Sequence, residues 1–174
     1  MAIKVFLFGL DQAGKTFITN YLIVSMSVGA KAYNPTLGFN VKNFSIKNLQ
    51  FQIWDAPGQT KLRETWKKGY SNAELLIFVL DVADKERFKE ARDALQMVLE
   101  NFKAKHVPLI FCNHKMDIKE AKENLPHAQK FFSSTLENKK AVELETSIHI
   151  SDSMEQLKNQ FVLKARHVRD SALH

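Results

Sequence analysis

The sequence predicts an α/β protein of one domain, with a mostly parallel sheet covered by helices on both faces. Short apolar runs that are typical of buried strands alternate with longer segments whose apolar residues recur at helical spacing. The chain has 174 residues, enough for one hydrophobic core, and shows no repeat, linker or low-complexity tract that would mark a second domain. We therefore treat residues 1–174 as a single domain.

The expected strands are short and apolar or alternating. The step Lys47-Asn48 separates two alternating runs and is short enough for a tight hairpin, so these two strands should be antiparallel neighbours. The remaining strands should be parallel and buried, because helical segments connect them. The segments with strand character are 3–8, 39–46, 49–55, 75–81, 107–113 and 141–146.

The expected helices lie between these strands. Residues 15–28 follow the first strand, and residues 61–68 follow the hairpin. In 84–102 one helical face carries Phe88, Ala91, Leu95, Val98, Leu99 and Phe102. Near the end of the chain one face carries Met154, Leu157, Phe161, Ala165 and Val168. Each apolar face is predicted to pack on the sheet.

Composition and charge narrow the classes of function. The formal net charge of +6 comes without the binding module or interleaved aromatics of nucleic-acid-binding proteins, so we expect no nucleic-acid partner. The apolar runs are shorter than the roughly 18 residues of a membrane span, and neither Ala2 nor the last four residues fit a lipid-attachment signal. Cys112 is the only cysteine, which favours a reducing compartment. We expect a monomeric cytoplasmic protein.

The basic segments 61–68 and 158–169 carry much of the excess charge. Charged helix faces of this kind are usually solvated. An acidic protein partner and a weak contact with a membrane surface remain as alternatives.

A phosphate-binding motif is the most specific feature of the sequence. Residues 9–16 read GLDQAGKT and match G-x-x-x-x-G-K-[ST] after a strand and at the start of a helix. In that position, backbone N–H groups at the helix N-terminus surround phosphate groups. Lys15 would reach the β and γ oxygens, and the Thr16 hydroxyl would bind Mg²⁺. The alternative is a glycine turn without a ligand.

Two further segments indicate which kind of nucleotide-binding protein this is. Residues 35–40 read PTLGFN and precede the first hairpin strand, and residues 54–59 read WDAPGQ and end the second. Together with the phosphate loop they resemble the Arf/Sar branch of the Ras-type small GTPases over essentially the whole chain. The resemblance implies the P-loop fold, with about six strands that are mostly parallel and one antiparallel strand between the two switches. It also implies Mg²⁺ and bound GTP or GDP.

The resemblance assigns roles around the phosphates. Thr36 would place its hydroxyl on Mg²⁺, and Asp55 would hold the ion through water. Gly58 would offer its N–H to the γ-phosphate, and Gln59 would be the catalytic residue that orients the attacking water. The nucleotide contacts implied in the phosphate loop are Asp11, Gln12, Ala13, Gly14, Lys15, Thr16 and Phe17.

The base-reading segment departs from the family pattern Asn-Lys-x-Asp. Residues 113–117 read NHKMD, so counting back from Asp117 puts Lys115 in the Lys position and His114 in the Asn position. A one-residue bulge would instead restore Asn113 to the site. Asp117 can accept N–H groups of guanine, whereas adenine presents a lone pair there, so guanine selectivity should survive. His114 would contact the base through its ring N–H or merely fill space at the pocket edge.

A last base contact is expected after the final strand. Thr146, Ser147 and Ile148 are similar to the Ser-Ala or Cys-Ala element of the family, in which a backbone N–H reaches the guanine carbonyl. We assign Ser147 and Ile148 to nucleotide binding. A chance likeness is the alternative.

Aromatic residues near the hairpin suggest how partners bind. Phe39, Trp54 and Trp66 match the surface that effectors read in the family, together with switch II. Gly69 and Tyr70 stand where a tyrosine pair is usual. Packing within the hairpin is the alternative explanation for Phe39 and Trp54.

The implied reaction is hydrolysis of GTP to GDP and phosphate. Arg63 is interpreted as a solvated or partner-binding charge and not as an arginine finger, so turnover should be slow without an activating protein. The predicted function is a nucleotide-dependent switch with an activating protein, an exchange factor and effectors as partners. The alternative is a nucleotide-stabilised scaffold, a pseudo-GTPase or a relative of the signal-recognition receptor β-subunit. Gln59 and Thr36 favour the switch, while His114 and Pro57 are compatible with the scaffold.

Overall fold

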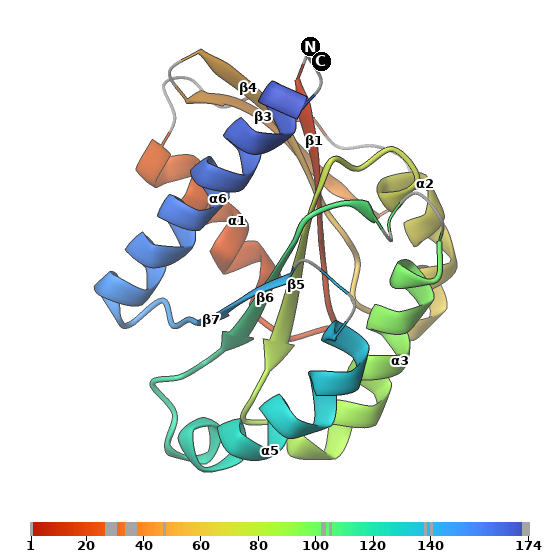
Figure 1. The fold of residues 1–174 in the computed structure, drawn as a ribbon, viewed down its shortest axis with the longest axis vertical. Coiled ribbons are helices and arrows are strands. Elements are labelled where there is room, and N and C mark those ends of the chain that lie inside the picture. The colour runs from red at the N-terminus through yellow and green to blue at the C-terminus, as the bar shows by residue number, and fades with distance from the viewer. Residues whose placement is uncertain are drawn as a thin grey trace.

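A seven-stranded sheet runs through the molecule, with helices on both faces (Figure 1). The computed structural model describes residues 2–26, 31–33, 38–46, 48–101, 104, 106–137, 139 and 141–171. The strand order is β2-β3-β4-β1-β5-β6-β7. The strands are β1 (Ile3–Phe8), β2 (Lys31–Tyr33), β3 (Asn40–Ile46), β4 (Leu49–Asp55), β5 (Leu75–Asp81), β6 (Leu109–His114) and β7 (Ala141–Glu145).

The pairing confirms the predicted fold class. β3 and β4 form the expected antiparallel hairpin, while β4, β1, β5, β6 and β7 pair in parallel. The short strand β2 pairs antiparallel with β3 and is a seventh strand that the sequence pattern did not indicate. Three residues are too few to show a period, so only the neighbouring strand identifies this segment.

The helices form two layers. On one face α1 and α6 pack on the side of the sheet that carries Val5 and Leu7, and on the other α2, α3 and α5 pack on the side that carries Phe6 and Phe8 (Figure 1). Among the described residues, no helix combines the length and the apolar character that a membrane span requires. The helices are α1 (Lys15–Met26), α2 (Trp66–Tyr70), α3 (Phe88–Leu99), α5 (Lys119–Leu136) and α6 (Ser151–Ser171), with 3-10 turns η1 (Thr60–Thr65) and η2 (Lys85–Arg87).

The predicted apolar faces are buried. In α3, Phe88, Ala91, Leu95 and Val98 are buried and Leu99 is half-buried, while Phe102 lies outside the described residues. In α6, Met154, Leu157, Phe161 and Ala165 are buried and Val168 is half-buried. Cys112 is also fully buried, and burial raises the pKa of its thiol to about 12. Cys112 therefore behaves as a small apolar core residue.

The aromatic surface expected for effectors is largely internal, which corrects that prediction. Trp66 is fully buried, with its ring 6.1 Å from that of Phe6 and its indole N–H donating to the Pro57 carbonyl at 2.8 Å. Phe39 is only 3% exposed. The reason is that α2 and the start of β3 cover the aromatic side chains of β1. Of the three, Trp54 alone is partly exposed, with the Lys4 ammonium 4.2 Å from its ring centroid.

Gly69 shows how tightly α2 approaches the sheet. A Cβ at this position would lie 2.3 Å from the Phe6 ring and 3.3 Å from that of Phe39. Phe6 is fully buried among other rings, so it has no free space to move into. A tyrosine at position 69 would therefore not fit in this packing.

Gly69→Ala should lower the free energy of unfolding by about 1–3 kcal/mol, because the added methyl group overpacks the core. Helix propensity alone predicts that the same substitution raises the free energy of unfolding, since alanine favours a helix interior more than glycine does. Urea unfolding of this variant beside Lys67→Ala, which changes an exposed residue of the same helix, measures the difference. A stabilised Gly69→Ala protein would contradict the close packing of α2 on Phe6.

Candidate functional site

The phosphate loop joins β1 to α1, and glycines shape it. A Cβ on Gly9 would lie 2.3 Å from the Val79 carbonyl oxygen, so the loop leaves β1 in close contact with β5. Gly14 has φ +98°, and Gln12 also has a positive φ of 62°. A Cβ on Gly14 would meet the His114 ring at 2.6 Å. The base-reading segment thus touches the phosphate loop directly.

Lys15 lies buried inside this loop. Its side chain is 7% exposed, and its ammonium donates to the Leu10 carbonyl at 2.6 Å. Burial lowers the pKa of Lys15, while the carboxylates of Asp55 and Asp11 act in the opposite direction. A lysine ammonium at the loop that begins a helix is suited to bind phosphate oxygens.

Thr16 and Asp55 supply oxygen ligands next to the loop. Leu7 pairs with Asp55 across the β1–β4 ladder, and the Thr16 hydroxyl donates to the Asp55 carboxylate at 3.1 Å. Burial raises the pKa of Asp55, and Lys15 opposes that shift. A hydroxyl and a carboxylate at this distance fit Mg²⁺, which takes few protein oxygens and completes its shell with phosphate and water. Thr36 lies outside the described residues.

The segment after β4 rests on the phosphate loop. A Cβ on Gly58 would lie 2.2 Å from the Asp11 backbone nitrogen, so only glycine allows this approach. Pro57 precedes it and is half-buried, with its carbonyl bonded to the Trp66 indole. Gln59 follows with an exposed side chain at the start of η1. The backbone at 57–58 is therefore held while the Gln59 side chain reaches solvent.

Arg63 is neither a solvated charge nor a free partner-binding one, which corrects that interpretation. It is 9% exposed and donates to the Gly58 carbonyl at 2.9 Å and to Glu90 at 2.6 Å. Arg87 bonds both Glu90 and Asp11, each at 2.8 Å. Arg87, and then Arg63, lower the pKa of Glu90 to about 2. The network ties switch II and the phosphate loop to α3.

The end of β6 decides which residue faces the base site. β6 is regular through His114, and its pairing with β7 aligns Asn113 with Glu145, so no bulge restores Asn113 to the site. His114 is 3% exposed, and its Nδ1 lies 2.9 Å from the Thr146 hydroxyl. Burial, followed by the charge of Lys115, lowers the pKa of His114 to about 4. Its ring is therefore neutral at pH 7.

Lys115 and Asp117 project from the turn after β6. Lys115 adopts φ 67° and its ammonium pairs with Asp81 at the end of β5. The Ser147 hydroxyl donates to the Asp117 carboxylate and lowers the pKa of that group. Asp117 is exposed and stays ionised at neutral pH. It is thus an oriented acceptor for N–H donors, the property that guanine recognition requires.

The loop after β7 is ordered by its own hydrogen bonds. The Ser147 N–H donates to the Ser153 hydroxyl at 3.0 Å, and the His149 N–H donates to the Ser147 hydroxyl at 3.1 Å. Ser147 is fully buried, whereas Ile148 is 40% exposed. A base carbonyl that accepted a hydrogen bond from the Ser147 N–H would have to displace the bond between this N–H and the Ser153 hydroxyl.

Both halves of the predicted site open into one cavity of about 470 Å³. Its size is in the range of ligand pockets. The predicted residues Ala13, Asp55, Gly58 and Ser147 are buried and do not line it, and neither do Asp11 and Gln59. The lining residues are Gln12, Gly14, Lys15, Thr16, Phe17, His114, Lys115, Asp117, Ile118, Ile148 and His149.

A known protein family matches most of the chain. Residues 1–163 match the model of the ADP-ribosylation factor (Arf) family. The chain belongs to the Arf family. Among solved structures, the chain is similar to that of the small GTPase Arl6 (BBS3) from Trypanosoma brucei, described with the bound nucleotide analogue GppNp. The TM-score is 0.70 at 22% identity, covering 92% of this chain and 99% of that one, so this likeness concerns the fold.

Some residues at the site of this Arf-family protein are not predicted by its sequence. His149 and Ile118 line the cavity, but no motif marks either of them. Arg87 and Glu90 show an i,i+3 spacing that indicates an ion pair, yet nothing in the sequence connects that pair to Asp11. Only the packing of α3 beside the phosphate loop makes this connection.

The acid sensitivity of the fold should depend in part on His114. Because the folded state holds this ring neutral, only the unfolded chain gains a proton between about pH 6.5 and pH 4. Stability conferred by the neutral ring above pH 6.5 is lost as the pH falls. The advantage of wild type over His114→Asn in free energy of unfolding should shrink by about 2 kcal/mol from pH 8 to pH 5, as measured by urea unfolding. A constant difference would place His114 in solvent.

Arg63→Ala should lower the free energy of unfolding by about 2 kcal/mol, because the Gly58 carbonyl and Glu90 lose a nearly buried partner. Lys61→Ala removes an exposed charge from the same turn and serves as the control. Chemical unfolding at neutral pH compares the two. Equal effects would mean that the Arg63 side chain is solvated.

Proposed function

We propose that this Arf-family chain binds GTP and GDP with Mg²⁺, hydrolyses GTP slowly, and acts as a nucleotide-dependent molecular switch. The observation that carries the proposal is the single cavity in which Lys15 and Thr16 face Lys115 and Asp117. One end suits phosphates and the other a base with N–H donors, so the cavity fits a purine nucleotide along its length.

At the phosphate end, Lys15 exchanges its bond to the Leu10 carbonyl for phosphate oxygens. Thr16 and Asp55 would hold Mg²⁺, which supplies positive charge to the β- and γ-phosphate oxygens. Gln59 orients the attacking water, and because its side chain is exposed, it must turn inward for this role. Slow turnover follows, and an activating protein would raise the rate by supplying order and charge.

At the base end, the ionised Asp117 accepts N–H groups of guanine, and the Ser147 hydroxyl keeps its carboxylate oriented. The neutral His114 ring lies against the loop at Gly14. In the tautomer whose Nδ1–H donates to the Thr146 hydroxyl, the Nε2 atom of His114 is an acceptor. In the other tautomer, Nε2 is a donor. The ring replaces one arm of an Asn amide, which favours weaker binding and faster release of nucleotide.

The switch itself is the segment that begins at Gly58. Its backbone lies against Asp11, so a γ-phosphate that bonds the Gly58 N–H acts on a segment already held to the loop. Arg63 and Glu90 connect this segment to α3. Hydrolysis removes the γ-phosphate contact and changes what partner proteins find at switch II.

The expected partners are an activating protein, an exchange factor and effectors. Trp54 and the charged face of switch II are the accessible parts of the surface first assigned to effectors. We propose a monomer that acts in the cytoplasm, with any weak contact at membrane surfaces made through its basic segments or its partners.

Single-turnover hydrolysis of bound GTP with Mg²⁺ should be slow in wild type and at least tenfold slower in Gln59→Leu, which loses the water-orienting amide. ATP should fail to compete with GTP for binding, because Asp117 requires N–H donors on the base. The exposed neighbour Thr60→Val is the matched control and should hydrolyse GTP as wild type does.

Two outcomes would overturn parts of this proposal. GTP that stays bound and intact in every protein would favour the nucleotide-stabilised scaffold. Effective competition by ATP would contradict the assignment of Asp117 and His114 to guanine recognition.

A further inference from the structure

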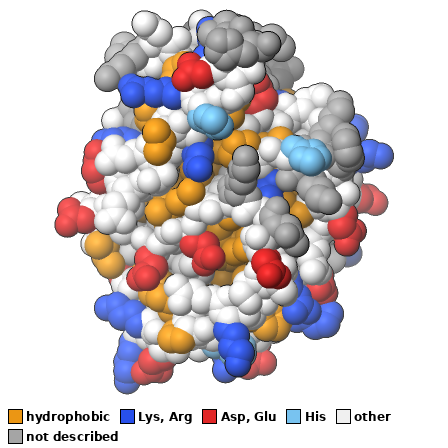
Figure 2. All heavy atoms as spheres, viewed as in Figure 1, with side chains coloured by type: hydrophobic (Ala, Val, Ile, Leu, Met, Phe, Trp, Pro, Cys, Tyr) orange, Lys and Arg blue, Asp and Glu red, His pale blue; other side chains and the backbone are white. Residues whose placement is uncertain are grey.

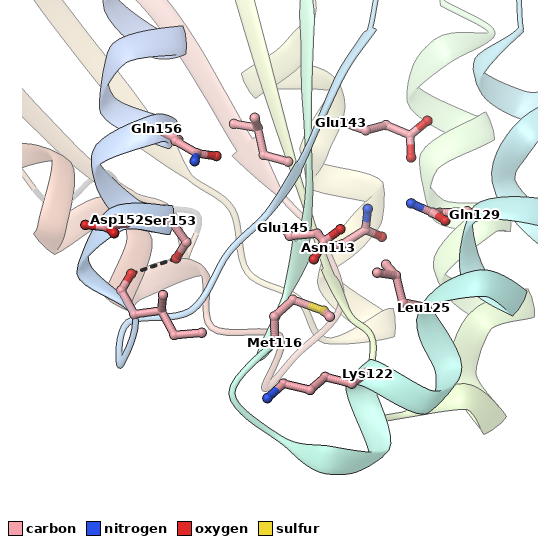
Figure 3. Close-up of a pocket in the computed structure, with 12 residues that line it drawn as sticks. Asn113, Met116, Lys122, Leu125, Gln129, Glu143, Glu145, Asp152, Ser153 and Gln156 are labelled. Atoms are coloured by element: carbon pink, nitrogen blue, oxygen red, sulfur yellow. Dashed lines mark hydrogen bonds between the residues drawn. The ribbon is translucent and has the colours of Figure 1, made fainter.

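A second cavity, of about 700 Å³, lies at the edge of the sheet between α5 and the start of α6 (Figure 3). It shares no lining residue with the nucleotide cavity. β7 is the last strand in the sheet order and passes between the two helices here. The proposed function assigns nothing to this cavity.

Asn113 is the unexplained group in its wall. The side chain is 2% exposed, and its amide oxygen has no hydrogen-bond partner in the part of the chain that the structure describes. Successive residues of a strand point to opposite faces, so while His114 faces the nucleotide cavity, Asn113 faces this one. A buried amide oxygen without a partner is costly, and such a group in a folded protein calls for a ligand or another role.

The charges around Asn113 are mainly negative, although the whole chain carries a net charge of +6. Glu145 is its cross-strand neighbour, and the two side chains lie side by side in Figure 3. Glu143 adds a carboxylate from β7, Asp152 lies across the cavity at the start of α6, and Lys122 is the one cation among the described residues of the lining. Figure 2 shows acidic side chains around a hollow on this face.

The floor of the cavity is apolar. Met116 and Leu125 line it on the α5 side of the sheet and Leu144 on the α6 side, and hydrophobic side chains show inside the hollow in Figure 2. An occupant therefore needs an aliphatic part as well as a charged end. A bare metal ion would not use this floor, whereas an alkyl chain that ends in N–H donors would.

We propose that this cavity binds an organic cation with an aliphatic stem, the chemistry of an arginine side chain. The guanidinium N–H groups donate to the exposed Glu145 carboxylate and, once the Asn113 side chain turns from its buried position toward the cavity, to the Asn113 amide oxygen, while the stem lies on Met116 and Leu125. A guanidinium presents several N–H donors in one plane, which matches two adjacent acceptors on neighbouring strands. Glu143 and Asp152 add long-range attraction.

The test uses the GDP-loaded, ¹⁵N-labelled protein and titration with Nα-acetyl-arginine amide followed by NMR. Saturable shifts should appear at backbone amides around Asn113 and Glu145. The control ligand is Nα-acetyl-citrulline amide, which has nearly the same shape but is neutral. Equal shifts with both ligands, or no saturable shift with the arginine ligand, would overturn the proposal.

Variants separate a binding role from a structural one. Asn113→Ala should weaken arginine binding about tenfold or more while raising Tm, because it removes an unpaired buried oxygen. Glu145→Gln should weaken binding similarly, and Glu123→Gln, an exposed acid of α5 outside the lining, should leave it unchanged. Binding at wild-type affinity in Asn113→Ala, or the same loss in Glu123→Gln, would contradict the proposed contacts.

Two further ligands distinguish the source of the cation. Agmatine represents a free small molecule, and the peptide acetyl-Ala-Arg-Ala-amide represents a segment of a partner protein that lies along β7. Tighter binding of the peptide would identify a protein partner, and tighter binding of agmatine a metabolite. Failure of both to compete with Nα-acetyl-arginine amide would overturn a specific guanidinium site.

Discussion

The contact between Gly58 and the phosphate loop is the constraint on which the rest of the nucleotide site depends. The backbone nitrogen of Asp11 would lie 2.2 Å from any Cβ at position 58, so two backbones meet with no side chain between them. Parallel pairing of β1 and β4 creates this contact, because both strands end at the same edge of the sheet. Arg63 bonds both the Gly58 carbonyl and Glu90, which connects this contact to α3. The phosphate loop, switch II and α3 are therefore linked by a continuous set of contacts.

The end of β6 serves two cavities at once. His114 fills the space beside Gly14 at the nucleotide site, and Asn113 faces the acidic cavity on the other side of the strand. Because histidine stands in the expected Asn position and asparagine stands one residue earlier, both cavities are affected. The base site has a neutral ring in place of an amide, while the opposite face has an amide oxygen that no described residue pairs with.

The aromatic core explains why the expected effector surface is small. Phe6 and Phe8 project from β1 toward α2, and Trp66 covers them completely. Gly69 lets α2 come close enough for this packing, which a tyrosine would prevent. Phe39 and Trp66 therefore stabilise the fold here, and of the three aromatic residues that match the family pattern Trp54 alone is partly exposed.

The sequence by itself determined the order of the helices and of every strand except β2, and the place of the phosphate loop after the first strand, because local period and motif spacing encode them. It predicted that His114 would take the Asn position, and regular β6 agrees. Tertiary structure alone decided that Arg63 is buried and that the Asn113 amide oxygen has no partner among the described residues. Burial and pairing depend on residues far apart in the chain, which no local pattern reports.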